Sequence, residues 1–473
     1  MERIQIDDFS QVKMLSQLQA SPSGEKLAFV VTQAQVKANK YVSHIHLLEN
    51  GKVRKLTSGG AEKSLYWLDE EHILFPGDRT GKYKAMADEG FHYTVFNKIS
   101  IQGGEAEEYF ALPFPASNLI VLGDGKFLCI GQYDNYAMTT EGLEGAEKEE
   151  MLQKIQEEKD YEIFDELPFW FNGKGIVNKK RGRVYLCDIC KNEQKAITGP
   201  YMQVTGLKYN KELGLALYYG SDYQWMDDQI SRMFVYDLKT GESREMDLGG
   251  KYRVQAADFV GDHILMAATT GERYGSNENP IFFNVDISTG KMQELADLDT
   301  SLGSSVGSDC RYGSGIHMKA CEDALYYVSA RAHYSVLYRW QPGKEPEVLT
   351  GEDCSVDFFD IRDGKIFTVG FAGNDLQEVY RLEKDGSQKK VTGFNKNALK
   401  GKYVATPQPL TFVNKEGNTI EGWVLLPKDY DESKTYPALL DIHGGPRATF
   451  GTCFFHQMQT MASDGCFVMF CNP

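Results

Sequence analysis

The chain has 473 residues, more than a single hydrophobic core usually supports, so two domains are expected. Hydrophobic residues make up 42% and charged residues 25% of the sequence, values that fit a globular protein and exclude a disordered or fibrous one. Its 51 Lys and Arg against 67 Asp and Glu give a net charge of -16, so neither nucleic acid nor an anionic membrane is expected as a partner.

The amino terminus and the cysteines point to a cytoplasmic protein. No basic segment leads into an apolar stretch after Met1, so no secretory signal is expected, and no window approaches a membrane span. Nine cysteines, an odd number scattered over the chain, suit reduced thiols better than a disulfide framework. Cys187 and Cys190 have the spacing of half a zinc site, but no second pair follows at a usable distance, so we predict no metal and no cofactor.

A loose repeat of strand, turn and strand runs through most of the chain. One half of the repeat is a strand that ends in Asp or an equivalent residue, then a turn with Gly, then a polar strand, as at 235–242 and 284–291, with weaker copies at 47–52 and 380–386. The other half is an apolar strand that follows an acidic or Gly turn, as at 21–30, 123–130, 262–267 and 363–369. Alternation of the two halves gives four short strands per unit, which is typical of a propeller blade.

The units predict an all-β propeller of about seven four-stranded blades, a count that leaves six or eight open. They begin near residues 19, 64, 115, 203, 253, 314 and 355. The third unit contains a helical interruption from about 144 to 161, where Glu150 and Lys154 form an i,i+4 pair and Met151, Leu152 and Ile155 form a short apolar stripe. We interpret the charged residues of this helix as a face that is exposed to solvent.

The pattern changes after Phe394, where helices begin to alternate with buried strands. A linker is predicted at 395–409, with strands at about 410–414, 420–426 and 438–442, a helix at 454–463 and another buried strand at 466–471. This alternation is the start of an α/β-hydrolase fold. The expected domains are therefore a propeller over 1–394, the linker, and the incomplete first part of the hydrolase domain over 410–473.

The segment 436–446 carries the most informative motif, an apolar strand that ends in His443, Gly444 and Gly445. Such a strand places backbone N–H groups at the carboxyl edge of a sheet, and the glycines allow the main chain to approach a substrate carbonyl. A preorganised donor that stabilises the oxyanion of acyl transfer lowers the activation free energy by about 3 to 4 kcal/mol. The alternative interpretation is a tight turn between a strand and a helix.

The long propeller, the linker, the two strands and this motif, in that order, resemble the prolyl oligopeptidase family of serine peptidases, most closely its acylaminoacyl-peptidase and dipeptidyl aminopeptidase-like branch. The similar segments are 161–175, 421–427, 436–446 and 465–469. The resemblance implies a serine peptidase that hydrolyses short or unfolded peptides through an acyl-serine intermediate, with the propeller gating access. It also implies that the N–H of Gly445 is an oxyanion donor and that Gly444 and His443 shape the turn.

The family's Ser, Asp and His follow this region, so we expect the triad beyond Pro473 and a truncated chain that is inactive alone, with no catalytic residue of its own. The segment 303–307 fits the G-x-S-x-G pattern, but Ser305 precedes the oxyanion strand and lies between predicted propeller strands, so we do not assign it as the nucleophile. His317 and His333 are likewise not assigned, because nothing in the sequence places them beside a serine.

Two alternatives stay open. In the first, the propeller binds peptides or proteins and the hydrolase segment is vestigial; an apolar strand edge left uncovered at residue 471 argues against it. In the second, the protein is an esterase or lipase, which would share the oxyanion motif and differ in its substrate. Exopeptidase or endopeptidase specificity, the preferred side chain, the state of the amino terminus and the oligomeric state are not predicted.

Overall fold

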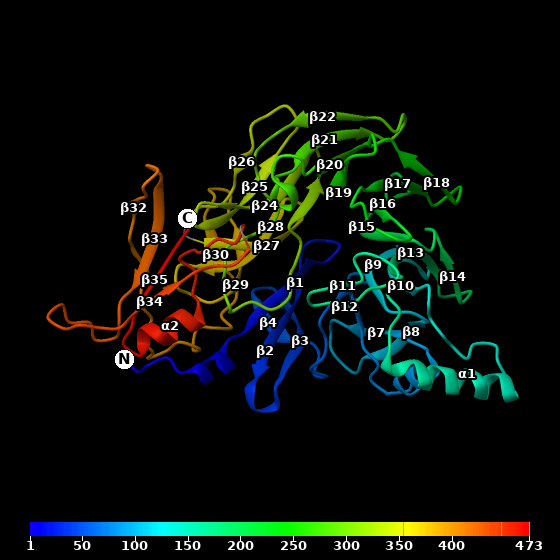
Figure 1. Cartoon of the computed structure of the whole chain (residues 1–473), viewed down its shortest axis with the longest axis horizontal. Coiled ribbons are helices and arrows are strands. Elements are labelled where there is room, and N and C mark those ends of the chain that lie inside the picture. The colour runs from blue at the N-terminus through cyan, green and yellow to red at the C-terminus, as the bar shows by residue number, and fades with distance from the viewer. Residues whose placement is uncertain (353, 446, 473) are drawn as a thin grey trace. The chain divides into compact units, whose positions relative to one another are not determined.

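The computed structural model describes residues 1–352, 354–445 and 447–472 (Figure 1). The chain forms two compact units, of which the first comprises Met1–Leu65 with Thr300–Pro473 and the second comprises Tyr66–Asp299. Strands dominate both units. In the described part of the chain no helix is both long and apolar enough to cross a membrane.

Three antiparallel four-stranded sheets belong to the first unit, and in each of them the strands follow one another in chain order. The first sheet has β1 (Met14–Ala20), β2 (Leu27–Gln35), β3 (Lys40–Glu49) and β4 (Lys52–Lys55). The second has β23 (Met318–Cys321), β24 (Ala324–Arg331), β25 (Tyr334–Trp340) and β26 (Glu347–Val348). The third has β27 (Cys354–Arg362), β28 (Lys365–Ala372), β29 (Glu378–Leu382) and β30 (Gln388–Lys390).

Four antiparallel four-stranded sheets belong to the second unit. They comprise β5 (Tyr66–Trp67), β6 (His72–Pro76), β7 (Thr94–Ser100) and β8 (Glu107–Leu112); then β9 (Ala116–Gly123), β10 (Lys126–Asp134), β13 (Lys180–Asp188) and β14 (Glu193–Ala196). The other two comprise β15 (Met202–Asn210), β16 (Leu215–Asp222), β17 (Arg232–Asp237) and β18 (Glu242–Met246); then β19 (Arg253–Val260), β20 (His263–Thr269), β21 (Ile281–Asp286) and β22 (Met292–Ala296). The predicted predominance of short antiparallel strands is thus confirmed.

The two near-identical turns of the sequence repeat adopt the same structure. The Asp237 carboxylate accepts hydrogen bonds from the N–H groups of Lys239 and Thr240, at 2.7 and 3.2 Å, before Gly241 takes a φ of +77°. In the matching turn the Asp286 carboxylate accepts from Thr289 N–H at 2.6 Å and from the Ser288 hydroxyl, and these hydrogen bonds lower its pKa to about 2. Side-chain hydrogen bonds to the backbone therefore fix the hairpins that the sequence pattern predicted.

A long insertion leaves the sheet between β10 and β13, two strands that pair with each other over nine residue positions. It contains α1 (Gly145–Glu157), a 3₁₀ turn (Glu158–Asp160) and a short hairpin of β11 (Trp170–Phe171) and β12 (Gly175–Ile176). The helix agrees with the one predicted near 144–161, and it has no buried residue, as its charged composition suggests. The other 3₁₀ turns are Ile6–Gln11, Val36–Ala38, Lys84–Glu89 and Gly275–Asn277.

The last part of the chain forms a mixed sheet in the order β31, β33, β35, β34, with β32 paired to β33. Its strands are β31 (Gln408–Pro409), β32 (Phe412–Val413), β33 (Thr419–Leu425), β34 (Ala438–Asp441) and β35 (Phe467–Asn472), and α2 (His456–Ser463) lies between the last two in sequence. β34 and β35 are parallel, whereas β33 and β35 are antiparallel. A strand, a helix and a parallel strand form a βαβ unit.

His46 on β3 predicts a pH-dependent stability. Its ring packs against Phe29 and Phe394, and burial lowers its pKa from 6.5 to about 4. Because the unfolded chain binds the proton at a higher pH than the folded chain, stability should fall as the pH drops from about 7 to about 4, by about 2 to 3 kcal/mol at about 1.4 kcal/mol per unit. Denaturant unfolding at several pH values should show a flatter profile for His46→Phe, whereas His92→Gln, a control at an exposed histidine, should keep the wild-type slope. Equal slopes for His46→Phe and the wild type would contradict the assignment.

Candidate functional site

The residues His443, Gly444 and Gly445 follow β34 after one intervening residue, Ile442, at the carboxyl end of the parallel strand pair. Gly445 has a φ of +55°, a left-handed conformation that favours glycine, and its carbonyl accepts a hydrogen bond from Ala448 N–H at 2.9 Å. A Cβ at Gly444 or Gly445 would meet no atom within 4 Å. The turn is therefore bordered by open space, as a backbone that must approach another molecule requires.

The His443 side chain closes one side of this turn. Its ring meets the ring of Phe450 edge to face, at 5.2 Å and 74°. Both ring nitrogens are inaccessible to solvent and have no hydrogen-bond partner among the described residues. Phe450 in turn packs on Phe470 of β35, so the histidine rests on the core of the mixed sheet.

A cavity of about 430 Å³ lies beside the turn. Thr419 and Glu421 line it from the amino end of β33, Asn472 from the carboxyl end of β35, and His443 from the turn. The remaining lining residues are Ala332, Arg447, Ala448 and Thr449. Because β33 runs antiparallel to β35, its amino end meets the carboxyl ends of β34 and β35, and all three strands deliver polar groups to one edge.

Asn472 fixes the loop that carries three of these residues. Its side-chain oxygen accepts a hydrogen bond from Phe450 N–H at 2.8 Å, and its side-chain amide donates to the Phe450 carbonyl at 2.9 Å. This two-way bond ties the end of β35 to the segment that follows the Gly444–Gly445 turn. The wall of the cavity is therefore held by hydrogen bonds between the Asn472 side chain and the backbone, and not only by side-chain packing.

The hairpin tip between β24 and β25 lines the cavity through Ala332, and His333 follows it in the chain. The His333 ring lies 5.1 Å from the Trp423 ring, and its Nδ1 lies 3.6 Å from a carboxylate oxygen of Glu421. A Cβ at Gly451 would lie 2.2 Å from the His333 carbonyl oxygen, so only glycine fits there. His333, which the sequence analysis left unassigned, thus joins the hairpin to the mixed sheet.

Ser305 lies nearer to this site than its place in the sequence suggests. Its hydroxyl is 3.0 Å from the hydroxyl of Thr449, whose N–H donates to the Ser305 carbonyl at 3.0 Å, and Gly307 N–H donates to the Thr449 carbonyl at 2.7 Å. Thr449, not a histidine, is the partner of the Ser305 hydroxyl. His317 lies elsewhere, with Nδ1 3.1 Å from the Asp357 carbonyl, and burial lowers its pKa.

The segment after Ser305 also holds α2 in place. The Asp309 carboxylate accepts hydrogen bonds from the N–H groups of His456 and Gln457, at 2.7 and 2.8 Å, and so caps the first turn of the helix. The Ser308 hydroxyl donates to the Phe454 carbonyl at 2.8 Å. Sequence reasoning missed this role, because a cap supplied from 147 positions away leaves no local signal.

The two spaced cysteines differ in their burial. Cys187 is buried on β13 with its sulfur 3.9 Å from that of Cys129, whereas Cys190 is exposed. Among the residues that the structure describes, no group of three or more His, Cys, Asp or Glu side chains is placed to hold a metal ion.

The relatives and solved structures described here are peptidases or parts of peptidases. No protein-family model matches the sequence. The uncharacterized peptidase YuxL of Bacillus subtilis is 21% identical over 99% of this chain and 70% of its own length. A solved acylaminoacyl peptidase, in complex with Z-Gly-Gly-Phe-chloromethyl ketone, superposes with a TM-score of 0.76 at 16% identity over the whole of this chain and 67% of that one. The β-propeller domain of the Trilobed protease from Pyrococcus furiosus superposes with a TM-score of 0.53 at 14% identity, over 84% of this chain and all of that domain.

Proposed function

We propose, on the premise that this chain resembles the prolyl oligopeptidase family of serine peptidases in sequence and in fold, that the protein is a serine peptidase. The observation that carries the proposal is the open Gly444–Gly445 turn at the carboxyl end of β34, beside a cavity of about 430 Å³. A turn of this kind can hold main-chain donors against a substrate carbonyl. Short or unfolded peptides would be the substrates.

In the proposed reaction a serine hydroxyl attacks the carbonyl carbon of the scissile bond, while a histidine removes the hydroxyl proton. The carbonyl oxygen becomes an oxyanion, which the N–H of Gly445 would stabilise, with Gly444 and His443 shaping the turn. Collapse of this intermediate breaks the C–N bond, and the histidine returns the proton to the leaving amine. Water then hydrolyses the acyl-serine and frees the enzyme.

The serine, aspartate and histidine of this reaction would lie beyond Pro473, so this chain would have no peptidase activity alone. The coverage supports the proposal, because nearly the whole chain aligns with YuxL but accounts for 70% of that protein, and it accounts for 67% of the solved acylaminoacyl peptidase. Ser305 is not proposed as a substitute, because its hydroxyl is paired with Thr449.

We further propose that each four-stranded sheet is one blade of a seven-bladed propeller over 1–394, which would gate access to the site. Within the described residues there are seven such sheets, in support of this count. The linker would be 395–409, and the hydrolase domain would begin at 410. A cytoplasmic location is also proposed, since all nine cysteines are free thiols.

The reading frame beyond the codon for Pro473 tests the proposal. We expect a continuation that encodes a G-x-S-x-G elbow, then Asp, then His, and we expect the continued protein to hydrolyse peptide anilides. Replacement of the elbow serine by alanine should abolish turnover, and simple esters should be poorer substrates than peptides. A stop codon directly after Pro473, or a continued protein that cleaves esters only, would overturn the assignment.

A further inference from the structure

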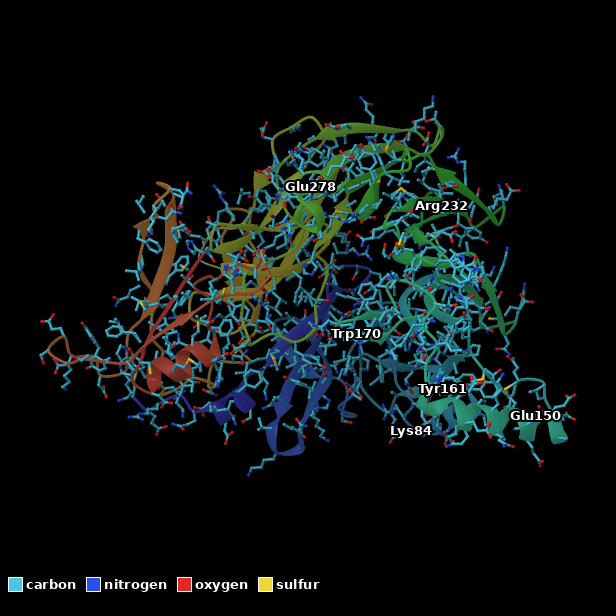
Figure 2. The ribbon with its side chains drawn as sticks, in the orientation of Figure 1. Lys84, Glu150, Tyr161, Trp170, Arg232 and Glu278 are labelled. Carbon is cyan, nitrogen blue, oxygen red and sulfur yellow. The ribbon has the colours of Figure 1, made fainter. Side chains whose placement is uncertain are left out.

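The second unit exposes a group of large apolar side chains that the site does not use. It comprises Phe164, Leu167, Trp170, Phe171, Trp225 and Met226, which are between 44 and 65% exposed. We call this group the aromatic surface. Figure 2 labels Trp170, which lies on β11 in the segment that links α1 to β13. Contiguous exposed apolar side chains of this kind mark interaction sites.

The aromatic surface is continuous across two segments of the chain. Leu167 N–H donates to the Trp225 carbonyl at 2.9 Å, and Asp227 N–H donates to the Leu167 carbonyl at 2.8 Å. These bonds place Leu167 beside Met226 in a parallel bridge. The rings of Phe164 and Phe169 lie 4.5 Å apart, and Trp170 and Phe171 follow Phe169 in the chain, on β11 of the β11–β12 hairpin.

Buried ionic contacts hold these exposed side chains in position. The Arg181 guanidinium, which is fully buried, donates to both carboxylate oxygens of Glu166, at 3.1 and 2.7 Å. Lys179 N–H donates to Glu166 at 2.7 Å, and the Lys179 ammonium lies 4.1 Å from the centre of the Trp225 ring. The aromatic surface is therefore preorganised, which lowers the entropy that a ligand must overcome on binding.

The exposed charges that neighbour the aromatic surface along the chain are mainly negative, and the Lys174 ammonium, 5.8 Å from the centre of the Phe171 ring, is a positive one. The range 157–174 contains six acidic residues and two lysines. Glu166 is buried and Asp165 lies 3.6 Å from Lys179, but Asp160 and Glu162 are exposed, and so is Asp228 beside Met226. An acidic rim attracts a cationic partner. The same rim disfavours pairing of this surface with itself in a second copy, since a two-fold interface would bring like charges together.

We propose that the aromatic surface docks extended polypeptide segments in which aromatic or aliphatic side chains stand next to Lys or Arg. As a docking site for substrate it rests on the proposed peptidase function, and it would bind polypeptide without any catalytic residue. The apolar side chains of the partner would cover Trp170 and Met226, and its basic side chains would face the acidic rim. Long apolar peptides would thereby gain affinity that dipeptides cannot gain.

Fluorescence anisotropy with the 473-residue chain tests the docking site. The probe is a labelled synthetic 12-residue peptide that alternates Phe or Leu with Lys, and the comparison peptide has Glu in place of each Lys. We expect the Lys peptide to bind at least about tenfold more tightly than the Glu peptide, and Trp170→Ser, Met226→Ser and Glu162→Lys each to weaken it by about tenfold. Tyr274→Ser, the matched control at another exposed aromatic of the same unit, should leave the affinity unchanged.

Absence of binding, or equal binding by the wild type and both apolar variants, would overturn the docking site. A change of oligomeric state on Trp170→Ser without an effect on peptide binding would also overturn it, in favour of an interface between copies. The catalytic proposal fails separately: if the continued protein hydrolyses no peptide but the chain still binds the Lys peptide, only the peptidase assignment is lost. If it hydrolyses peptides and Trp170→Ser leaves KM for the 12-residue peptide unchanged, the docking site is lost and the peptidase stands.

Discussion

Replacement of Arg181 by Met is expected to lower the free energy of unfolding by about 3 to 5 kcal/mol, because it leaves the buried Glu166 carboxylate with only the more distant Lys179 ammonium, at 3.9 Å, as a cation. Neither side chain of this pair is exposed. Arg181 also donates to the carbonyls of Tyr201 and Tyr223, at 3.1 and 3.0 Å, and its guanidinium lies 3.9 Å from the centre of the Tyr223 ring. Chemical denaturation of wild type and variant measures the loss.

The matched control is Arg232→Met in the same unit. Arg232 pairs with Glu245 at 2.6 Å and with Asp222 at 3.1 Å, but its side chain is 44% exposed, so its loss should cost less than about 1 kcal/mol. The double variant Arg181→Met, Glu166→Gln should recover part of the stability, since it also removes the buried negative charge that Arg181 no longer compensates. A cost for Arg181→Met no larger than that of Arg232→Met would show that the buried pair does not hold the insertion.

The β-rich architecture was predictable from local sequence patterns because each hairpin carries its own turn chemistry. Asp237 and Asp286 bond to the backbone two and three residues ahead, so the pattern of the turn and its structure coincide. The same holds for the Gly444–Gly445 turn, which a strand pattern and two glycines indicate without any long-range contact. The pairing of β10 with β13 could not be predicted from the repeat, because the insertion separates the two strands in the sequence. The helix α1 within the insertion could be predicted from its charge pattern.

The surroundings of the candidate site could not be predicted, because they come from distant parts of the chain. Ser305 meets Thr449 across 144 positions, and the hairpin tip at Ala332 and His333 meets Glu421 and Gly451. No periodicity marks such contacts. A glycine such as Gly451 gives the nearest signal, but the sequence alone does not reveal that it is required by the approach of the His333 carbonyl.

Replacement of Phe454 by Ala is expected to cost about 3 to 5 kcal/mol, the range for emptying the space of a buried aromatic ring. Phe454 is fully buried just before α2. It packs in one cluster with Ile4, Val12 and Met14 from the start of the chain and with Val306 and Phe371. The space left by the Phe454 ring would therefore weaken the contact between the amino-terminal segment and α2, the helix that follows the candidate oxyanion turn.

Phe412→Ala provides the control, since Phe412 is 50% exposed on β32 and its loss should change the free energy of unfolding by no more than about 0.5 kcal/mol. Thermal and denaturant unfolding measure both variants. The cluster joins residues more than 400 positions apart, so hydrogen exchange should also rise at Ile4 and in α2 together for Phe454→Ala. Faster exchange in α2 alone would mean that the amino-terminal segment is held by its other contacts, among which Ile4 N–H donates to the Ser463 hydroxyl at 2.7 Å. A loss of stability equal to that of Phe412→Ala would contradict the role of Phe454 as the centre of this cluster.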